Sequence, residues 1–185
     1  MNKVLIATTF AILSGAAFAT ENPMFGVDTK NSIALNIAQS TGSHNIRKLV
    51  WFPDWEISPQ TFVMLTYAQP MEILRLPSRM NISVVQNIAY ESSKGLSFIG
   101  VGASWDIALV QYHGFYLGIG IGPYYRDNHD RWVSSRFMFG EKVFLGKNIT
   151  DRWHGELFTI HFSNGDLTEI NHGFNFVGIG VNYSF

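Results

Sequence analysis

The sequence predicts an all-β protein, an eight-stranded antiparallel transmembrane β-barrel. Three observations lead to this fold class: a charge-poor composition, strand-length segments with alternating polarity, and an aromatic C-terminal end. The 185 residues are 46% hydrophobic and 15% charged, whereas about 25% of an ordinary soluble domain is charged. Beyond its first residues the chain has no apolar run of spanning-helix length. A membrane barrel fits this combination, because its strands alternate between apolar residues facing lipid and polar residues facing the lumen.

Composition also excludes several classes of function. The formal net charge of −1 provides no basic field for binding nucleic acid. The chain has no Cys, which excludes a disulfide scaffold, thiolate zinc sites and cysteine catalysis. The six His residues show no recognisable metal-ligand spacing, so no metal site and no cofactor are expected.

Residues 1–19 have the features of a secretory signal peptide. Lys3 precedes an apolar stretch from Val4 to Leu13, and the segment ends in a small-x-small cleavage pattern at Ala17-Phe18-Ala19. Cleavage before Thr20 would leave residues 20–185 as one barrel domain. An uncleaved membrane anchor is the alternative, although the apolar stretch is short for a spanning helix.

Eight segments of the remaining chain have strand character, and none has a helical apolar stripe. The first shows the pattern clearly, because Ile33, Leu35 and Ile37 alternate with small or polar residues. In the last, odd-numbered apolar residues from Val177 to Phe185 alternate with Gly, Asn and Ser. The expected strands are 31–39, 60–68, 80–90, 95–105, 111–124, 131–146, 151–163 and 173–185.

With both termini in the periplasm, the order of the strands fixes the connections. Expected outer loops are 40–59, 91–94, 125–130 and 164–172, and expected inner turns are 69–79, 106–110 and 147–150. A soluble periplasmic β-barrel carrier would also alternate. The terminal Phe185 and the five Trp near strand ends favour an outer-membrane barrel with an aromatic girdle.

The stretch His161-Phe162-Ser163 contains the strongest candidate chemistry. Residues two apart on a strand share a face, so the imidazole can act as the base that a hydroxyl nucleophile requires. If residues 164–172 form a hairpin loop, His161 lies opposite Asn175, and directly opposed residues face the same side. All three would then lie on the lipid-facing surface near its outer edge, where polar groups are costly and usually functional.

These residues also carry a family resemblance. His161-Phe-Ser163-Asn164-Gly165, followed by Asn171-His-Gly-Phe-Asn175, resembles the C-terminal signature of the outer-membrane lipid A 3-O-deacylase (PagL-like) family, and Ser135-Arg-Phe-Met-Phe-Gly-Glu-Lys is similar to it as well. The resemblance implies an eight-stranded barrel that hydrolyses the ester-linked 3-acyl chain of lipid A without a metal. It implies Ser163 as nucleophile, His161 as general base, and Asn164 with the backbone near Gly165 as oxyanion donors.

The chain departs from the family at the third member of the triad, where Asn175 stands in place of a Glu. An amide can orient an imidazole but cannot stabilise imidazolium as a carboxylate does. We therefore rank Asn175 first on position and Glu169 second, with Asp166 and Glu156 as further nearby carboxylates. Glu141 is assigned to structure or to hydrogen bonding in the lumen.

Two hypotheses of function follow. In the first, the chain is a serine esterase in the bacterial outer membrane that deacylates lipid A of lipopolysaccharide. In the second, it is a non-enzymatic barrel of the same fold whose triad has decayed at position 175. Outer-membrane lipids are the expected surroundings, and the resemblance leaves a homodimer as one alternative for the oligomeric state.

Overall fold

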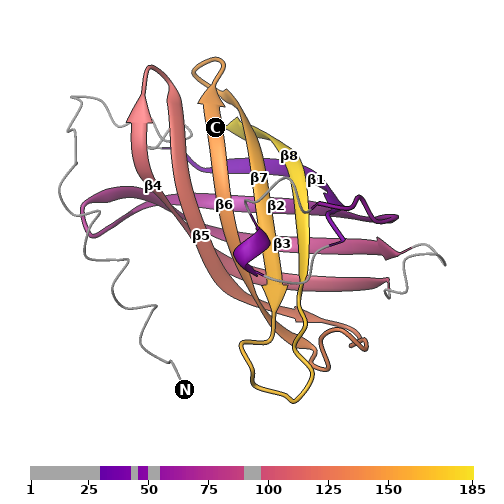
Figure 1. Ribbon diagram of the computed structural model, residues 1–185. Helices are drawn as coiled ribbons and strands as arrows, with labels where there is room; N and C mark the ends of the chain where they lie inside the picture. Colours follow the sequence, from indigo (N-terminus) through magenta and orange to yellow (C-terminus); the bar gives the residue numbers. More distant parts are fainter. Residues whose placement is uncertain (1–29, 43–45, 50–54, 90–96) are drawn as a thin grey trace.

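The computed structural model describes residues 30–42, 46–49, 55–89 and 97–185. Eight antiparallel strands, each paired with its sequence neighbours, close into a barrel when β1 pairs with β8 (Figure 1). The strands are β1 (Ser32–Ser40), β2 (Gln60–Ile73), β3 (Leu76–Ala89), β4 (Phe98–Tyr112), β5 (Phe115–Arg126), β6 (Phe137–Asn148), β7 (Trp153–Ser163) and β8 (Phe174–Ser184). A 3-10 turn, η2 (Ile46–Lys48), lies between β1 and β2. The predicted fold class is confirmed.

The two ends of the barrel differ in their connections. At one end, here called the turn end, short turns join β2 to β3, β4 to β5 and β6 to β7. The C-terminus lies at this end, and the long β7–β8 connection lies at the opposite one, the loop end (Figure 1). The signal peptide predicted for residues 1–19 and the loop predicted for 91–94 lie outside the described residues.

The expected turn at 69–79 is wrong, because β2 and β3 run through most of it. Their hairpin turns at Leu74 and Arg75, which both have positive φ (52° and 64°), as a tight two-residue turn requires. Pro70 lies in β2 and Pro77 lies in β3, although Pro cannot donate a hydrogen bond to a neighbouring strand. However, β1 pairs with β2 only as far as Ala68, and β4 pairs with β3 only from Ser78. The hairpin therefore protrudes beyond its neighbours as a pair of edges, where Pro is tolerated.

The expected turn at 106–110 is also wrong, since β4 continues to Tyr112. A register shift between Ala108 and Val110 interrupts the period-2 pattern that would have marked this stretch as a strand. Asp106, the first residue of that expected turn, is a buried luminal carboxylate with no exposed surface. At the loop end, residues 131–136 were expected in a strand, yet β6 begins only at Phe137.

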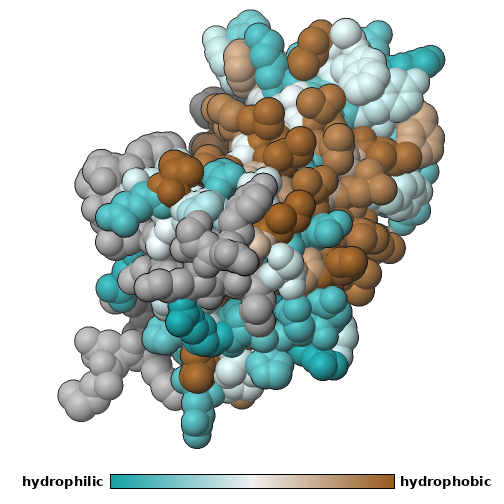
Figure 2. Space-filling model, turned by 90° about the vertical axis from the view of Figure 1, so that its right-hand side faces the viewer, coloured by the Kyte–Doolittle hydropathy of each residue, from teal (hydrophilic) through white to brown (hydrophobic). Residues whose placement is uncertain are grey.

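The outer surface of the barrel carries an apolar belt of outward-pointing strand residues. Figure 2 shows hydrophobic residues gathered in a broad band, with hydrophilic residues on either side of it. Such a band suits hydrocarbon. No helix within the described ranges has the length and apolar character needed to cross a bilayer. Belt residues that are at least 43% exposed include Leu35, Leu65, Val84, Leu117, Ile121, Leu157, Ile179 and Val181.

The lumen is divided into two halves. Its loop-end half is filled by aromatic side chains packed edge to face, such as Phe62 against Phe176 at 4.9 Å and Tyr124 against Phe162 at 5.2 Å between ring centroids. These contacts make the loop-end half a packed core. Buried residues of this group are Phe62, Phe98, Tyr124, Met138, Phe162, Phe174 and Phe176.

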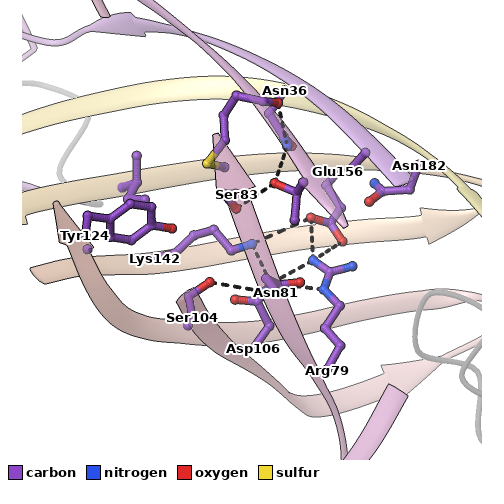
Figure 3. A pocket seen from close by; sticks show the side chains of 16 residues that line it. Asn36, Arg79, Asn81, Ser83, Ser104, Asp106, Tyr124, Lys142, Glu156 and Asn182 are labelled. Carbon is purple, nitrogen blue, oxygen red and sulfur yellow. Dashed lines mark hydrogen bonds and ion pairs between the residues drawn. The ribbon is translucent and has the colours of Figure 1, made fainter. Parts of the chain in front are cut away.

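The turn-end half of the lumen holds an ion-pair network around a cavity of about 20 Å³, room for one water molecule. Arg79 Nη2 lies 2.8 Å from both Asp106 Oδ2 and Glu156 Oε1. Lys142 Nζ lies 2.5 Å from Asp106 Oδ2, and the Tyr116 hydroxyl donates to Glu156 Oε1. Figure 3 shows the four charged side chains, Arg79, Asp106, Lys142 and Glu156, converging from different strands. Each buried charge is thereby paired, as low-dielectric burial demands.

Candidate active site

The register of the last three strands brings three polar side chains together near the loop end. His161 of β7 pairs with Asn175 of β8 on one side and with Glu141 of β6 on the other. Directly opposed residues in antiparallel strands point to the same face. That face is the exterior, because Leu157 and Ile179 lie farther along the same face and are both 58% exposed.

A hydrogen bond fixes the orientation of the imidazole. Nδ1 of His161 lies 2.5 Å from Oδ1 of Asn175. Since an amide oxygen can only accept, Nδ1 donates its hydrogen and Nε2 carries the lone pair. This tautomer is the one in which a histidine can take a proton at Nε2.

Ser163 is the last residue of β7 and has the same parity as His161. These two side chains and Asn175 point outward, as expected from parity, but they are buried rather than exposed to lipid. Their exposed fractions are 5% for His161, 8% for Ser163 and 1% for Asn175. The chain leaving β1 contacts β8 here, because the backbone N–H of Thr41 donates to the Asn175 carbonyl over 3.0 Å. Strand parity indicates direction but not which connecting segments lie nearby.

The absence of a side chain at Gly173 makes room for the imidazole of His161. A Cβ at position 173 would lie 2.8 Å from Nε2 of His161 and still closer to its Cε1. Gly173 also has a φ of +70°, which a residue with a side chain adopts only at a cost. Both constraints therefore favour glycine at the start of β8.

The loop after Ser163 is organised by Asn164. Its backbone N–H donates to Asn171 Oδ1 over 2.8 Å, and its amide nitrogen donates to the Ile170 carbonyl and to Thr168 Oγ1. Asn164 is fully buried, and these bonds engage its side-chain donors within the loop. Gly165 follows with a φ of +62°. The oxyanion role of Asn164 and Gly165 stays a prediction. Because the donors of Asn164 are already engaged within the loop, the backbone N–H near Gly165 is the better candidate for the oxyanion donor.

A second loop supports this one. Backbone bonds join Ser134 N–H to the Ile170 carbonyl and His172 N–H to the Trp132 carbonyl. The β5–β6 connection thus lies alongside the β7–β8 connection. Buried Arg126 holds it in place, donating to Asp130 Oδ2 and to the carbonyls of Val133 and Ser135.

The nearby carboxylates do not all reach His161. Glu169 is exposed in the loop, and Asp166 accepts a hydrogen bond from Asn171 Nδ2. Glu156 points into the lumen, where it pairs with Arg79. Of the two roles expected for Glu141, hydrogen bonding in the lumen is wrong, because its parity is outward and its cross-strand partner is His161. A structural role stays a prediction. Strand parity alone could not reveal this neighbour, since it leaves the register between β6 and β7 open.

Comparisons with known proteins bear on the family and the fold of the chain. The model of a family described as lipid A 3-O-deacylase (PagL) matches residues 47–184, well over half of the chain. The chain belongs to the PagL family. A comparison with curated protein sequences gives no match.

Two solved structures are similar to this PagL-family chain. The crystal structure of the outer membrane enzyme PagL matches with a TM-score of 0.59 and 11% identity, covering 83% of this chain and 99% of that one. The Yersinia pestis outer membrane protein Ail, solved in a phospholipid bilayer nanodisc, matches with a TM-score of 0.49 and 13% identity, covering 85% and 99%. The first likeness supports the barrel fold of this member of the PagL family.

Proposed function

We propose that the protein is a lipid A 3-O-deacylase of the bacterial outer membrane, an ester hydrolase that uses Ser163 as nucleophile. The observation that carries this proposal is the hydrogen bond between His161 Nδ1 and Asn175 Oδ1. It leaves Nε2 as the basic atom on the face that Ser163 shares. Membership of the lipid A deacylase family supplies the substrate class.

The reaction proceeds in two half-reactions. Ser163 Oγ attacks the carbonyl carbon of the ester-linked 3-acyl chain while its proton passes to His161 Nε2. The tetrahedral intermediate collapses when the bond to the sugar oxygen breaks, and the imidazolium returns the proton to that oxygen. Water then attacks the acyl-enzyme and loses a proton to His161. Release of a free 3-hydroxy fatty acid regenerates the Ser163 hydroxyl.

Stabilisation of the oxyanion is assigned to the turn that follows the nucleophile. A backbone N–H near Gly165 would donate to the developing negative charge, and Asn164 would hold the loop that positions this donor. Donors of this kind are worth about 3 kcal/mol each in an apolar site.

The surroundings of the site fit a lipid substrate. Ser163 and His161 point outward above the apolar belt, near the end of the barrel that carries the longer loops. We place this loop end in the outer leaflet, where lipid A of lipopolysaccharide resides, and assign export to a signal peptide at residues 1–19. For the oligomeric state of the protein in the membrane, a homodimer is one of the proposed alternatives.

The second candidate is a non-enzymatic barrel, and the amide at position 175 favours it. Replacing the triad carboxylate by an amide in a serine protease lowers the rate by about 10⁴. A barrel that no longer needed catalysis would tolerate such a change.

Lipid A composition in cells separates the two candidates. The full chain is expressed in a Gram-negative host that lacks a lipid A 3-O-deacylase, and lipid A is analysed by mass spectrometry. The proposal predicts loss of one 3-hydroxyacyl chain, and this loss disappears with Ser163→Ala or His161→Ala. Unchanged lipid A in cells that contain the folded barrel would favour the non-enzymatic candidate.

A further inference from the structure

The amide at position 175 supplies no charge to stabilise the imidazolium that forms on His161 during the reaction. In each half-reaction His161 accepts a proton and becomes a cation. A carboxylate beside Nδ1 stabilises such a cation, whereas the neutral amide of Asn175 supplies orientation but no charge. The expected loss in rate is large unless another anion lies close to the ring.

Glu141 occupies the position from which such an anion could act. It is the cross-strand partner of His161 on the side opposite Asn175, and directly opposed Cβ atoms in antiparallel strands lie about 5 Å apart. In the strand register, His161 therefore lies between Asn175 on β8 and Glu141 on β6.

The other immediate neighbours of Glu141 offer no charge. Across the strand on its second side it pairs with Ile121, and along β6 the residues of the same parity are Phe139 and Val143. Among these direct neighbours, His161 is the one that can become positively charged. Lys142, the adjacent cation in sequence, has the opposite parity and pairs with Asp106 in the lumen.

One carboxylate oxygen of Glu141 is also available to interact with a positive charge. Oε2 is buried and forms no hydrogen bond within the described part of the chain. A carboxylate on the outer face of a membrane strand is costly and marks a functional position. Stabilising the positive charge that His161 acquires would be a function for this costly carboxylate.

We propose that Glu141 is a positioning residue for the deacylation reaction, supplying the negative charge that stabilises the His161 imidazolium, while Asn175 holds Nδ1. This inference rests on the proposed function. It divides the work of a single triad carboxylate between two residues on opposite sides of the imidazole. In this role Glu141 acts through His161 and takes no part in the bonds that form and break.

Steady-state kinetics of the purified full chain in detergent, with lipid A as substrate, tests the proposal. Glu141→Gln is expected to lower kcat by about 10- to 1,000-fold, less than the roughly 10⁴ of a lost triad carboxylate, and to leave KM within about twofold. Glu141→Asp is expected to keep most of the activity. The matched control, Glu72→Gln, makes the same chemical change at an exposed carboxylate of the turn end and is expected to behave as wild type.

A rescue variant distinguishes charge from structure. Adding Asn175→Glu to Glu141→Gln restores a carboxylate at Nδ1, so kcat should recover by about tenfold or more. A purely structural role for Glu141 predicts no recovery. Activity of Glu141→Gln equal to wild type, or a loss that Asn175→Glu does not reverse in a folded barrel, overturns the inference alone. No deacylation by wild type overturns the proposed function and the inference together.

Discussion

The imidazole of His161 lies against Gly173, so that a Cβ at position 173 would stand 2.8 Å from Nε2. Gly173→Ala should therefore displace the ring from Asn175 and Ser163. Because the backbone φ of +70° also disfavours a side chain, we expect at least a tenfold loss of deacylase activity. The measurement is the rate of fatty acid release from lipid A by the purified variant.

Gly155→Ala is the control for that variant. A Cβ at position 155 meets no atom closer than 3.7 Å, and the residue lies on the same strand as His161. Both variants should migrate as folded barrels in electrophoresis without boiling. Wild-type activity in Gly173→Ala would show that the imidazole has more room than the structure indicates.

Asn175 is expected to orient His161 through its amide oxygen. Asn175→Ala removes the acceptor 2.5 Å from Nδ1 and should lower kcat by about tenfold or more, because the ring is no longer held in the reactive tautomer. Asn175→Glu retains an acceptor and adds charge, so it should keep or raise kcat. Single-turnover measurements would check both variants, and full activity of Asn175→Ala would contradict the orienting role of Asn175.

The luminal network should govern stability rather than catalysis. Asp106→Asn leaves Arg79 and Lys142 with one carboxylate, and Lys142 Nζ lies 4.0 Å from Glu156. Breaking a buried ion pair costs about 3–5 kcal/mol. We expect a lower unfolding midpoint in denaturant, with activity of the folded protein within about twofold of wild type.

Asp151→Asn is the matched change for this test, because Asp151 is exposed in the β6–β7 turn. It should leave the unfolding midpoint unchanged. Equal midpoints for Asp106→Asn and wild type would mean that the remaining carboxylate neutralises both cations.

Alternation predicted the strands, because a strand with one apolar and one small or polar face is informative without any tertiary contact. The low charge and the aromatic C-terminal end were needed to predict a membrane barrel. The predicted strand bounds were wrong where tertiary contacts override local sequence preferences. Pro70 and Pro77 lie in a hairpin that extends past its neighbours, and Asp106 is neutralised by cations from β3 and β6. Such partners are distant in sequence and follow only from the closed register.

The candidate site shows the same division. His161, Ser163 and Asn175 could be predicted together because β7 and β8 are joined by a single loop, which makes their register a matter of counting. The pairing of Glu141 with His161 could not be predicted, because the β6–β7 register depends on turn length and the pairing of Lys147 with Gly155 was needed to align the two strands. The burial of the site could not be predicted, since parity gives only the direction of a side chain.

Cleavage of the ester at the 3-position of lipid A by Ser163 is the core of the proposed function. Its most direct measurement uses purified wild type and Ser163→Ala with synthetic lipid A whose acyl chains differ at each position, followed by tandem mass spectrometry of the product. We predict release of the 3-linked chain alone by wild type and none by Ser163→Ala. Release of a chain from another position, or equal release by the folded Ser163→Ala barrel, would contradict the claim.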